Sequence, residues 1–300
     1  MASGNELTAI TMSNERKLQT PLQGNWLIIS DLDGTLLDHF DYSHSAADKL
    51  LAQLDIHNIP VVINSSKTAP EIIELRHELN NQHPFIVENG SAIYLPRSTF
   101  TQPPSDAIAD GDFWILELGV KRDLIAKFLS SDAEQFDSPY QSFANSSVEE
   151  IRQATDLSTK NIEQAMRRSY SEPLLWRGDD EQKHTFCQRA RHAGFTTLQG
   201  GRFLHVLGRC NKGSATKDLV DIYERHYKTK FGIIAAGDSP NDSDMLKVAD
   251  IAVLIRSPAH AFFELETTAM LIHSHEYGPR GWNEVVGKLF DFDDSSSTNP

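Results

Sequence analysis

The stretch NWLIISDLDGTLLDHF, residues Asn25 to Phe40, runs an apolar segment directly into two aspartates. Residues Trp26 to Ser30 are uncharged and mostly apolar, and Asp31 and Asp33 follow them one residue apart. Burying carboxylates without a partner costs free energy, because water no longer solvates their charge. The sequence therefore indicates that a cation lies beside Asp31 and Asp33.

A second apolar segment, FGIIAAGD, ends in Asp238, and Asp242 follows four residues later. Open parallel sheets bind their ligands at the carboxyl ends of the strands, where neighbouring strand ends come together. Three or four converging carboxylate oxygens suit octahedral Mg²⁺, which can also neutralise a phosphoryl group. The alternative interpretation of DLDGT is a solvated acidic turn, since Asp-Gly is common in turns. The matching GDSPND after a second strand disfavours that alternative.

Short apolar runs alternate with amphipathic stretches through much of the chain. WLIIS, IPVVIN and PFIVENG indicate strands, and SHSAADKLLAQLD and APEIIELRHEL indicate the helices between them. The same alternation returns with KGSATKDLVDIYERHY, FGIIAAGD and DIAVLI. This pattern is typical of a parallel sheet covered on both faces. We therefore expect an α/β fold, with a doubly wound, Rossmann-like parallel-sheet core.

The loop NSSK lies between an expected strand and an expected helix. Thr68 and Glu71 have capping-box spacing, and Pro70 falls in the first turn of that helix. Free backbone N–H groups at a helix start can hold an anion. The loop that contains Ser65 is therefore a predicted anion site.

The texture of the sequence changes between about residues 92 and 206, where strands and helices follow in another order. We interpret this segment as an inserted α+β domain, a cap over the core, in which QGGRFLHVLG forms a hairpin. The core is then expected at 25–91 and 207–290. Residues 1–24 and 291–300 are polar or poor in apolar residues, which predicts disordered tails.

Composition excludes several classes of partner. The chain has 28 basic and 42 acidic residues and a net charge of −14, which disfavours binding to nucleic acid or to an anionic membrane. Its two cysteines, Cys187 and Cys210, form no disulfide framework, which favours a reducing cytoplasm. No apolar run reaches the roughly 18 to 20 residues of a membrane span, and no signal peptide is evident. A soluble cytoplasmic protein is the expectation.

DLDGT, NSSK, a downstream lysine and GDSPND, in that order, resemble the four signature motifs of the haloacid dehalogenase superfamily of phosphatases. The resemblance implies that Asp31 is the nucleophile and Asp33 the general acid and base. A carboxylate is already ionised at neutral pH and can attack phosphorus directly, giving an aspartyl-phosphate. The implied Mg²⁺ ligands are Asp31, the main-chain carbonyl of Asp33, and Asp238.

The remaining motifs supply further implied roles. Ser65 would donate to a phosphate oxygen, and Lys212 would place a positive charge on the transferring phosphoryl group. Lys217 is the alternative lysine, but it is expected inside a helix, whereas Lys212 precedes one. Thr35, Asn241 and Asp242 would support the loops around the site, and Asp242 could also reach the metal.

SSKT, VENG, QGGRFLHVL and GPRGW resemble the mannosyl-3-phosphoglycerate phosphatase branch of this superfamily. The implied substrate, a small phosphorylated sugar acid, carries a phosphate, a glycerate carboxylate and a neutral sugar. Arg202 is our choice for recognising an oxyanion, because its guanidinium can bind one in a bidentate manner. Arg177 and Lys67 are weaker choices. The other predicted substrate-binding residues are Glu88, Asn89, Gly90 and His205, although His205 suits a packed strand equally well.

Other functions remain open at this point. The same chemistry could act on glucosyl-3-phosphoglycerate, sucrose phosphate or a hexose phosphate. A sugar phosphomutase would return the phosphoryl group to a sugar instead of to water. A non-catalytic binding module could keep the fold, but the intact set of Asp31, Asp33, Ser65, Lys212 and Asp238 argues against it.

Overall fold

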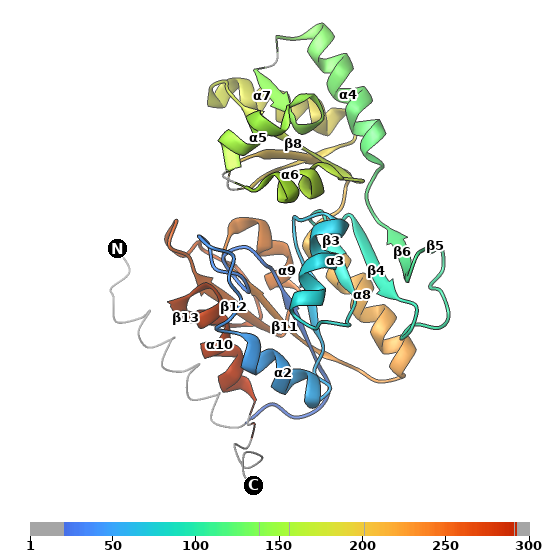
Figure 1. Cartoon of the computed structure of the whole chain (residues 1–300), viewed down its shortest axis with the longest axis vertical. Coiled ribbons are helices and arrows are strands. Elements are labelled where there is room, and N and C mark those ends of the chain that lie inside the picture. Colours follow the sequence, from blue (N-terminus) through green and yellow to red (C-terminus); the bar gives the residue numbers. More distant parts are fainter. Residues whose placement is uncertain (1–20, 138, 156, 201, 291, 293–300) are drawn as a thin grey trace. The chain divides into compact units, whose positions relative to one another are not determined.

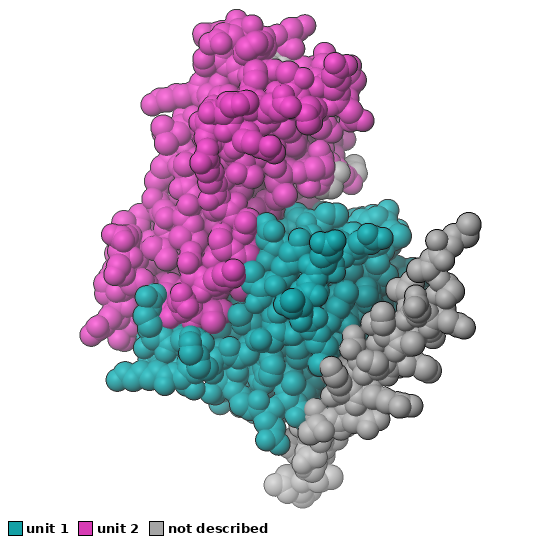
Figure 2. Space-filling model, turned by 180° about the vertical axis from the view of Figure 1, so that it is seen from behind, with its two compact units in different colours: residues 1–62, 223–300 teal, residues 63–222 magenta. Residues whose placement is uncertain are grey.

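The chain forms two compact units in a computed structural model that describes residues 21–137, 139–155, 157–200, 202–290 and 292. Unit 1 comprises residues 1–62 and 223–300, and unit 2 comprises residues 63–222 (Figure 2). Almost all of the two predicted tails lies outside the described residues. No helix in the described part of the chain is long and apolar enough to cross a membrane.

Unit 1 contains strands and helices from both ends of the chain. They are β1 (Trp26–Ser30), α2 (Asp48–Ile56), β11 (Gly232–Gly237), the 3-10 helix η3 (Pro240–Asp242), α9 (Ser243–Lys247), β12 (Ile251–Arg256), β13 (Met270–Tyr277) and α10 (Gly278–Leu289). Two further elements contain the unit boundaries: β2 (Val61–Asn64) and α8 (Lys212–Tyr227).

The strands of unit 1 lie in the order β13-β12-β11-β1, and each pair is parallel; Figure 1 labels β13, β12 and β11. Residues 27–30 of β1 are all buried. Because successive side chains of a strand point to opposite faces, burial of the whole run means that both faces are covered. The register pairs Ser30 with Ala236, so β1 and β11 end at the same edge.

Unit 2 contains more elements. They are α3 (Ala69–Glu78), β3 (Phe85–Val87), β4 (Ala92–Pro96), β5 (Ile108–Asp110), β6 (Phe113–Glu117), α4 (Arg122–Gln135), β7 (Tyr140–Ser142), the 3-10 helix η2 (Phe143–Asn145), α5 (Val148–Thr155), α6 (Thr159–Met166), β8 (Ser171–Trp176), α7 (Asp180–His192), β9 (Thr196–Gln199) and β10 (Leu204–Leu207).

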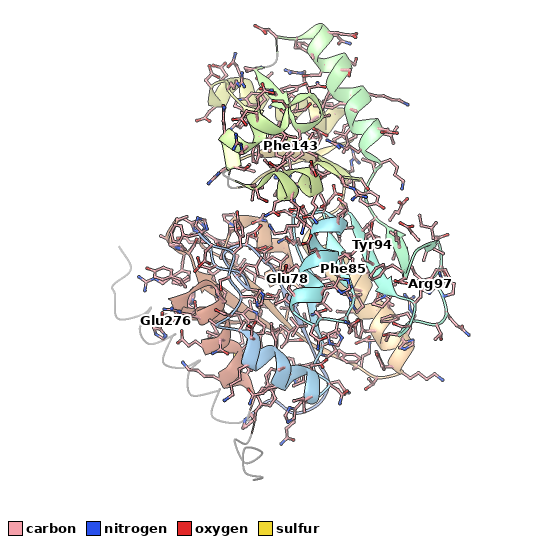
Figure 3. All side chains as sticks on the ribbon, in the orientation of Figure 1. Glu78, Phe85, Tyr94, Arg97, Phe143 and Glu276 are labelled. Carbon is pink, nitrogen blue, oxygen red and sulfur yellow. The ribbon has the colours of Figure 1, made fainter. Side chains whose placement is uncertain are left out.

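One group of strands in unit 2 has the order β2-β3-β4-β6-β5. β2 and β3 are parallel, whereas β4, β6 and β5 follow as antiparallel neighbours. Phe85 of β3 stacks on Tyr94 of β4, with ring centroids 4.8 Å apart (Figure 3). Residues 92–117, which the sequence pattern places in the cap, instead extend the strands next to β3. The exact domain boundaries stay a prediction.

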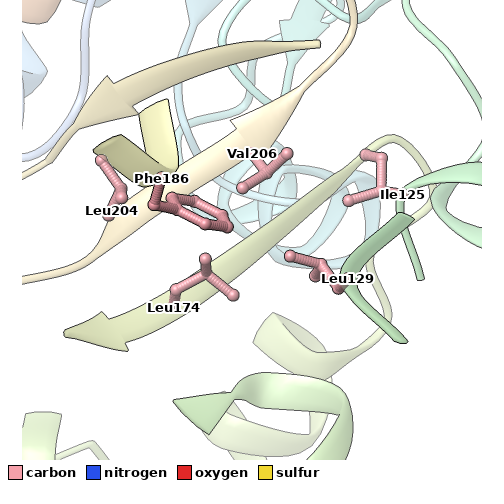
Figure 4. Packing of buried hydrophobic residues seen from close by; sticks show 6 residues of the cluster. All are labelled: Ile125, Leu129, Leu174, Phe186, Leu204 and Val206. Atoms are coloured by element: carbon pink, nitrogen blue, oxygen red, sulfur yellow. The ribbon is translucent and has the colours of Figure 1, made fainter. Parts of the chain in front are cut away.

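A separate sheet in unit 2, of which Figure 1 labels β8, has the antiparallel order β7-β8-β10-β9. Its β9–β10 pair is the hairpin expected from QGGRFLHVLG. Helices α4 and α7 pack against this sheet through a buried cluster (Figure 4). The cluster consists of Ile125, Leu129, Leu174, Phe186, Leu204 and Val206. The parallel strands confirm the predicted α/β fold, and the antiparallel sheet with its packed helices is an additional α+β part.

Candidate active site

Three buried carboxylates converge in unit 1. Asp31, Asp238 and Asp242 each offer one oxygen, and these oxygens lie within 4.8 Å of one another. Asp31 directly follows β1 and Asp238 directly follows β11, which is its parallel neighbour. The Asp31 N–H donates to the Ala236 carbonyl at 2.9 Å, which continues the strand pairing up to the cluster. The predicted meeting of the two strand ends is therefore observed.

This donor set fits a divalent metal ion. Like charges at such short range destabilise one another, and burial removes the water that would otherwise screen them. A hard cation relieves both effects, and carboxylate oxygens are its preferred ligands. The cluster can therefore hold a metal ion, as the opening stretch of the sequence indicates.

Gly34 allows the DLDGT turn to pass close to this cluster. Its φ is +79°, and a Cβ added there would lie 2.6 Å from Asp238 Oδ2. The turn is closed by the Gly34 N–H, which donates to the Leu37 carbonyl at 3.0 Å, and by the Thr35 N–H, which donates to the Leu32 carbonyl at 3.0 Å. Only glycine meets both the conformational and the spatial requirement at this position.

Asp242 organises the GDSPND loop. Its Oδ2 accepts hydrogen bonds from the Asp238 N–H at 3.2 Å and from the Ser239 N–H at 3.1 Å. The Ser239 hydroxyl also donates to the Asn241 side chain. These contacts tie residues 238–242 to one another, and the supporting role of Asn241 and Asp242 in the reaction stays a prediction.

Ser65 occupies the predicted loop in unit 2. It follows β2 directly, is buried, and donates its N–H to the Ile86 carbonyl at 3.1 Å. Its Oγ accepts a hydrogen bond from the Lys67 N–H at 3.2 Å. The capping box of Thr68 and Glu71 is present at the start of α3, so the predicted order of strand, loop and capped helix is confirmed.

Lys212 is the first residue of α8, and its side chain is almost completely buried, at 1% exposure for the residue. Its carbonyl accepts hydrogen bonds from Asn64 Nδ2 at 3.0 Å and from Thr216 Oγ1 at 2.8 Å. Lys217 is exposed, which favours Lys212 as the functional lysine. Sequence reasoning missed Asn64. Its signal is a polar residue at the end of an apolar strand.

The VENG turn has an unusual backbone. Glu88, Asn89 and Gly90 have φ values of +48°, +58° and +90°. A Cβ at Gly90 would lie 2.1 Å from the Asn211 carbonyl oxygen, so glycine is required there. The Asn89 side chain is buried, and its Oδ1 and Nδ2 have no hydrogen-bond partner among the described residues. Buried polar atoms of this kind can bind a ligand, and substrate binding by Asn89 stays a prediction.

Glu88 has contacts of a different kind from those predicted. Its carboxylate is buried and accepts hydrogen bonds from the Ser169 N–H at 2.9 Å, the Tyr170 N–H at 3.2 Å and the Ser171 hydroxyl at 2.6 Å. Arg168, which sequence reasoning missed, lies 4.0 Å from it. These contacts favour a positioning role for Glu88 over direct substrate contact.

The predicted residues of the β9–β10 hairpin differ in their environment. Arg202 is exposed and donates to the Ala154 carbonyl at 2.9 Å. His205 is buried, and burial together with the nearby Arg168 charge lowers its pKa to about 3, so its ring is neutral. Arg177 donates to Gln141 Oε1 at 2.5 Å, and Lys67 is half-buried.

Comparison with known proteins defines the class. Residues 28–264 match the family described as haloacid dehalogenase-like hydrolases, so the chain belongs to that family. A Thermoplasma acidophilum protein of known crystal structure has a similar fold, with a TM-score of 0.63 and 18% identity over 89% of this chain and 99% of that one. The predicted fold class is therefore confirmed.

Two relatives narrow the class further. A Methanococcoides burtonii protein named glucosyl-3-phosphoglycerate/mannosyl-3-phosphoglycerate phosphatase is 32% identical over 263 residues, which are 88% of this chain and 96% of the relative. A Pyrococcus furiosus mannosyl-3-phosphoglycerate phosphatase is 37% identical over 236 residues, covering 78% of this chain and 92% of the relative. The predicted resemblance and the predicted enzyme class, a phosphatase of this family, are confirmed.

Proposed function

We propose that the protein is a Mg²⁺-dependent phosphatase that hydrolyses mannosyl-3-phosphoglycerate to mannosylglycerate and phosphate. The observation that carries this proposal is the buried cluster of Asp31, Asp238 and Asp242 at the ends of two neighbouring parallel strands. The names of the two relatives support the substrate class. Glucosyl-3-phosphoglycerate is the second candidate, because the Methanococcoides burtonii relative is named for both sugars.

In the proposed reaction an Asp31 carboxylate oxygen attacks phosphorus, and the bond from phosphorus to the substrate oxygen breaks. Asp33 gives a proton to the leaving alkoxide. It then takes a proton from water, whose oxygen attacks phosphorus and releases phosphate from Asp31. The position of Asp33 inside the turn closed by Gly34 and Leu37 supports such a role, because the turn limits the movement of its backbone.

The proposed ligands of Mg²⁺ are Asp31, the main-chain carbonyl of Asp33, and Asp238. When bound, the ion offsets the negative charge of the carboxylates and of the phosphoryl group. Ser65 would donate its hydroxyl proton to a phosphate oxygen, and the Lys212 ammonium would stabilise the charge that develops on the transferring group. Burial of Ser65 and Lys212 strengthens such interactions, because the local dielectric is low.

Four side chains are the proposed substrate contacts. Asn89 would bind the sugar or glycerate hydroxyls through its buried amide, and Arg202 and Lys67 would bind the carboxylate. His205 would contact the substrate only as a neutral ring, in keeping with its lowered pKa. Free thiols at Cys187 and Cys210 agree with a proposed cytoplasmic location.

Phosphate release from a panel of phosphorylated sugars and glycerates tests this function. We expect the highest kcat/KM for mannosyl-3-phosphoglycerate or its glucosyl analogue, and loss of turnover when a chelator removes Mg²⁺. Ca²⁺ should replace it poorly, because Ca²⁺ binds oxygen at longer distances and with looser geometry. Equal turnover of sucrose phosphate, or full activity in chelator, would contradict the proposal.

A further inference from the structure

The loop that contains Ser65 is held through three consecutive carbonyl groups. The Ser65 carbonyl accepts a hydrogen bond from the Asn89 N–H at 2.9 Å, and the Lys67 carbonyl accepts one from the Glu88 N–H at 3.0 Å. Between them, the Ser66 carbonyl accepts one from Arg168 Nη1 at 3.0 Å. The path of this loop is therefore fixed by the turn at residues 88–89 and by the side chain of Arg168, which are distant in the sequence.

Arg168 and Glu88 form a buried pair. Their side chains are only 7% and 2% exposed, and Arg168 Nη1 lies 4.0 Å from Glu88 Oε2. Arg168 also donates to the Ser171 hydroxyl at 3.1 Å, while that hydroxyl donates to Glu88. Removing one member of such a pair leaves the other charge buried without compensation. Each residue therefore depends on the other for its position.

The backbone at Glu88 adds to this dependence. A residue with a side chain is strained at φ of +48°, and such a conformation persists only where surrounding contacts impose it. Here the Glu88 N–H is bonded to Lys67, and the carboxylate is bonded to residues 169–171. The contacts on both sides of Glu88 thus join the start of β8 to the Ser65 loop.

The direction of the Ser65 hydroxyl depends on this loop. Ser65 Oγ accepts the Lys67 N–H, so one lone pair is occupied and the hydroxyl proton is available for another acceptor. A shift of the loop backbone would move Oγ and the Lys67 N–H together. The hydrogen bond that Ser65 can give to a phosphate oxygen is thus sensitive to the carbonyl contacts of residues 65–67.

We propose that Glu88 and Arg168 are positioning residues, which orient the Ser65 hydroxyl toward the transferring phosphoryl group without touching the substrate. This inference rests on the proposed role of Ser65 as a phosphate ligand. It also gives a reason for the buried Arg168, which the proposed reaction does not otherwise use.

A double-mutant cycle tests the proposal with p-nitrophenyl phosphate as substrate. Ser65→Ala should lower kcat by about 10- to 100-fold, the loss of one hydrogen bond to a charged group. Glu88→Gln should lower kcat by nearly as much as Ser65→Ala does, with little change in KM. The double variant should lie within about twofold of Ser65→Ala alone, because both changes remove one interaction. Arg168→Lys, which keeps the charge but loses the planar guanidinium, should follow the same pattern.

Glu172 and Arg122 provide a matched control. Glu172 is buried, its Oε2 lies 2.5 Å from Arg122 Nε, and its Oε1 accepts the Ala144 N–H at 2.8 Å. Glu172→Gln likewise leaves a partly buried arginine without its charge partner, so it should lower the melting temperature by a similar amount to Glu88→Gln. Among the described residues, neither side chain of this pair donates to or accepts from residues 65–67. Glu172→Gln should change kcat less than about twofold, because in the described chain the Glu172 carboxylate does not bond the Ser65 loop.

Two results would overturn the positioning role in favour of general stabilisation. One is that the losses of kcat from Ser65→Ala and Glu88→Gln add up in the double variant, and the other is that Glu172→Gln lowers kcat as much as Glu88→Gln does. A loss from Glu88→Gln with no effect of Ser65→Ala would also overturn it, because Glu88 would then act by another route. If Glu88→Gln does not fold, the cycle with Arg168→Lys decides. If the protein hydrolyses p-nitrophenyl phosphate but not mannosyl-3-phosphoglycerate, the proposed substrate is wrong. The cycle still tests the positioning role in that case, since p-nitrophenyl phosphate carries no sugar.

Discussion

Replacement of Gly34 by alanine perturbs the carboxylate cluster directly. Two costs can be separated from the geometry. A φ of +79° costs an alanine about 1 to 2 kcal/mol, because Cβ approaches the neighbouring carbonyl in the left-handed region. The added Cβ also lies 2.6 Å from Asp238 Oδ2, so to reach ordinary contact at 3.4 Å the carboxylate must move by about 0.8 Å.

Displacement of the Asp238 carboxylate should lower activity. Asp238 is a proposed metal ligand, and a displacement of nearly 1 Å in a reacting geometry can lower a rate by about 100-fold. We therefore expect Gly34→Ala to reduce kcat/KM by about 100-fold and to raise the Mg²⁺ concentration needed for half-maximal activity. Phosphate release measured against Mg²⁺ concentration, together with thermal unfolding, checks both effects.

Gly194→Ala is the matched control. Gly194 has a φ of +94°, but nothing lies within 4 Å of the Cβ position among the described residues. It should therefore lose a similar amount of stability and keep both its kcat/KM and its Mg²⁺ dependence. Equal Mg²⁺ dependence in Gly34→Ala and Gly194→Ala would refute the reasoning, because it would show that backbone strain, and not displacement of Asp238, is responsible.

Four further predictions concern single side chains. Asp31→Asn should abolish turnover while the protein still folds, since an amide is a poor nucleophile and an uncharged metal ligand; substantial remaining activity would contradict the nucleophile assignment. Asp33→Asn should slow both proton transfers, so an aspartyl-phosphate should accumulate on Asp31 and be detectable by mass spectrometry; unchanged kinetics with a poor leaving group would exclude that role. Arg202→Ala should lower kcat/KM for mannosyl-3-phosphoglycerate about tenfold but leave that for p-nitrophenyl phosphate within about twofold, and equal losses would assign Arg202 to the phosphate or the fold. Because the pKa of His205 is lowered to about 3, the unfolded chain takes up a proton below about pH 6.5 that the folded protein excludes. Wild type should therefore lose stability relative to His205→Leu as the pH falls from 6 to 4, by about 1.4 kcal/mol in the free energy of unfolding per pH unit. Parallel pH dependences of the two proteins in denaturant titrations would exclude a buried neutral ring.

Much of the fold follows from local signals. The capping box at Thr68 and Glu71 needs only four consecutive residues, and the structure contains it as expected. The strand ending at Ser30 is uncharged and mostly apolar, which is typical of a strand buried on both faces. Residues 92–117 were harder to assign, because short apolar strands in antiparallel hairpins have the same local pattern in a core sheet as in a cap.

Some site residues could likewise be recognised from local sequence signals, whereas their long-range contacts could not. Asp31 and Asp238 could be recognised in sequence because each follows an apolar strand, and parallel strands of one sheet bring such ends together. Glu88 could be recognised as a strand-end residue, but its partners at 168–171 could not, since no local pattern links residues about 80 positions apart.

The sequence by itself therefore determined the α/β class, the family and the carboxylates of the proposed chemistry, because these depend on strand periodicity and on motifs a few residues long. Only the tertiary structure decided that Asp242 completes the buried cluster, that Glu88 and Arg168 hold the Ser65 loop, and that His205 is neutral. The physical reason is that burial and long-range hydrogen bonds depend on which distant segments pack together, and this packing is a property of the whole fold.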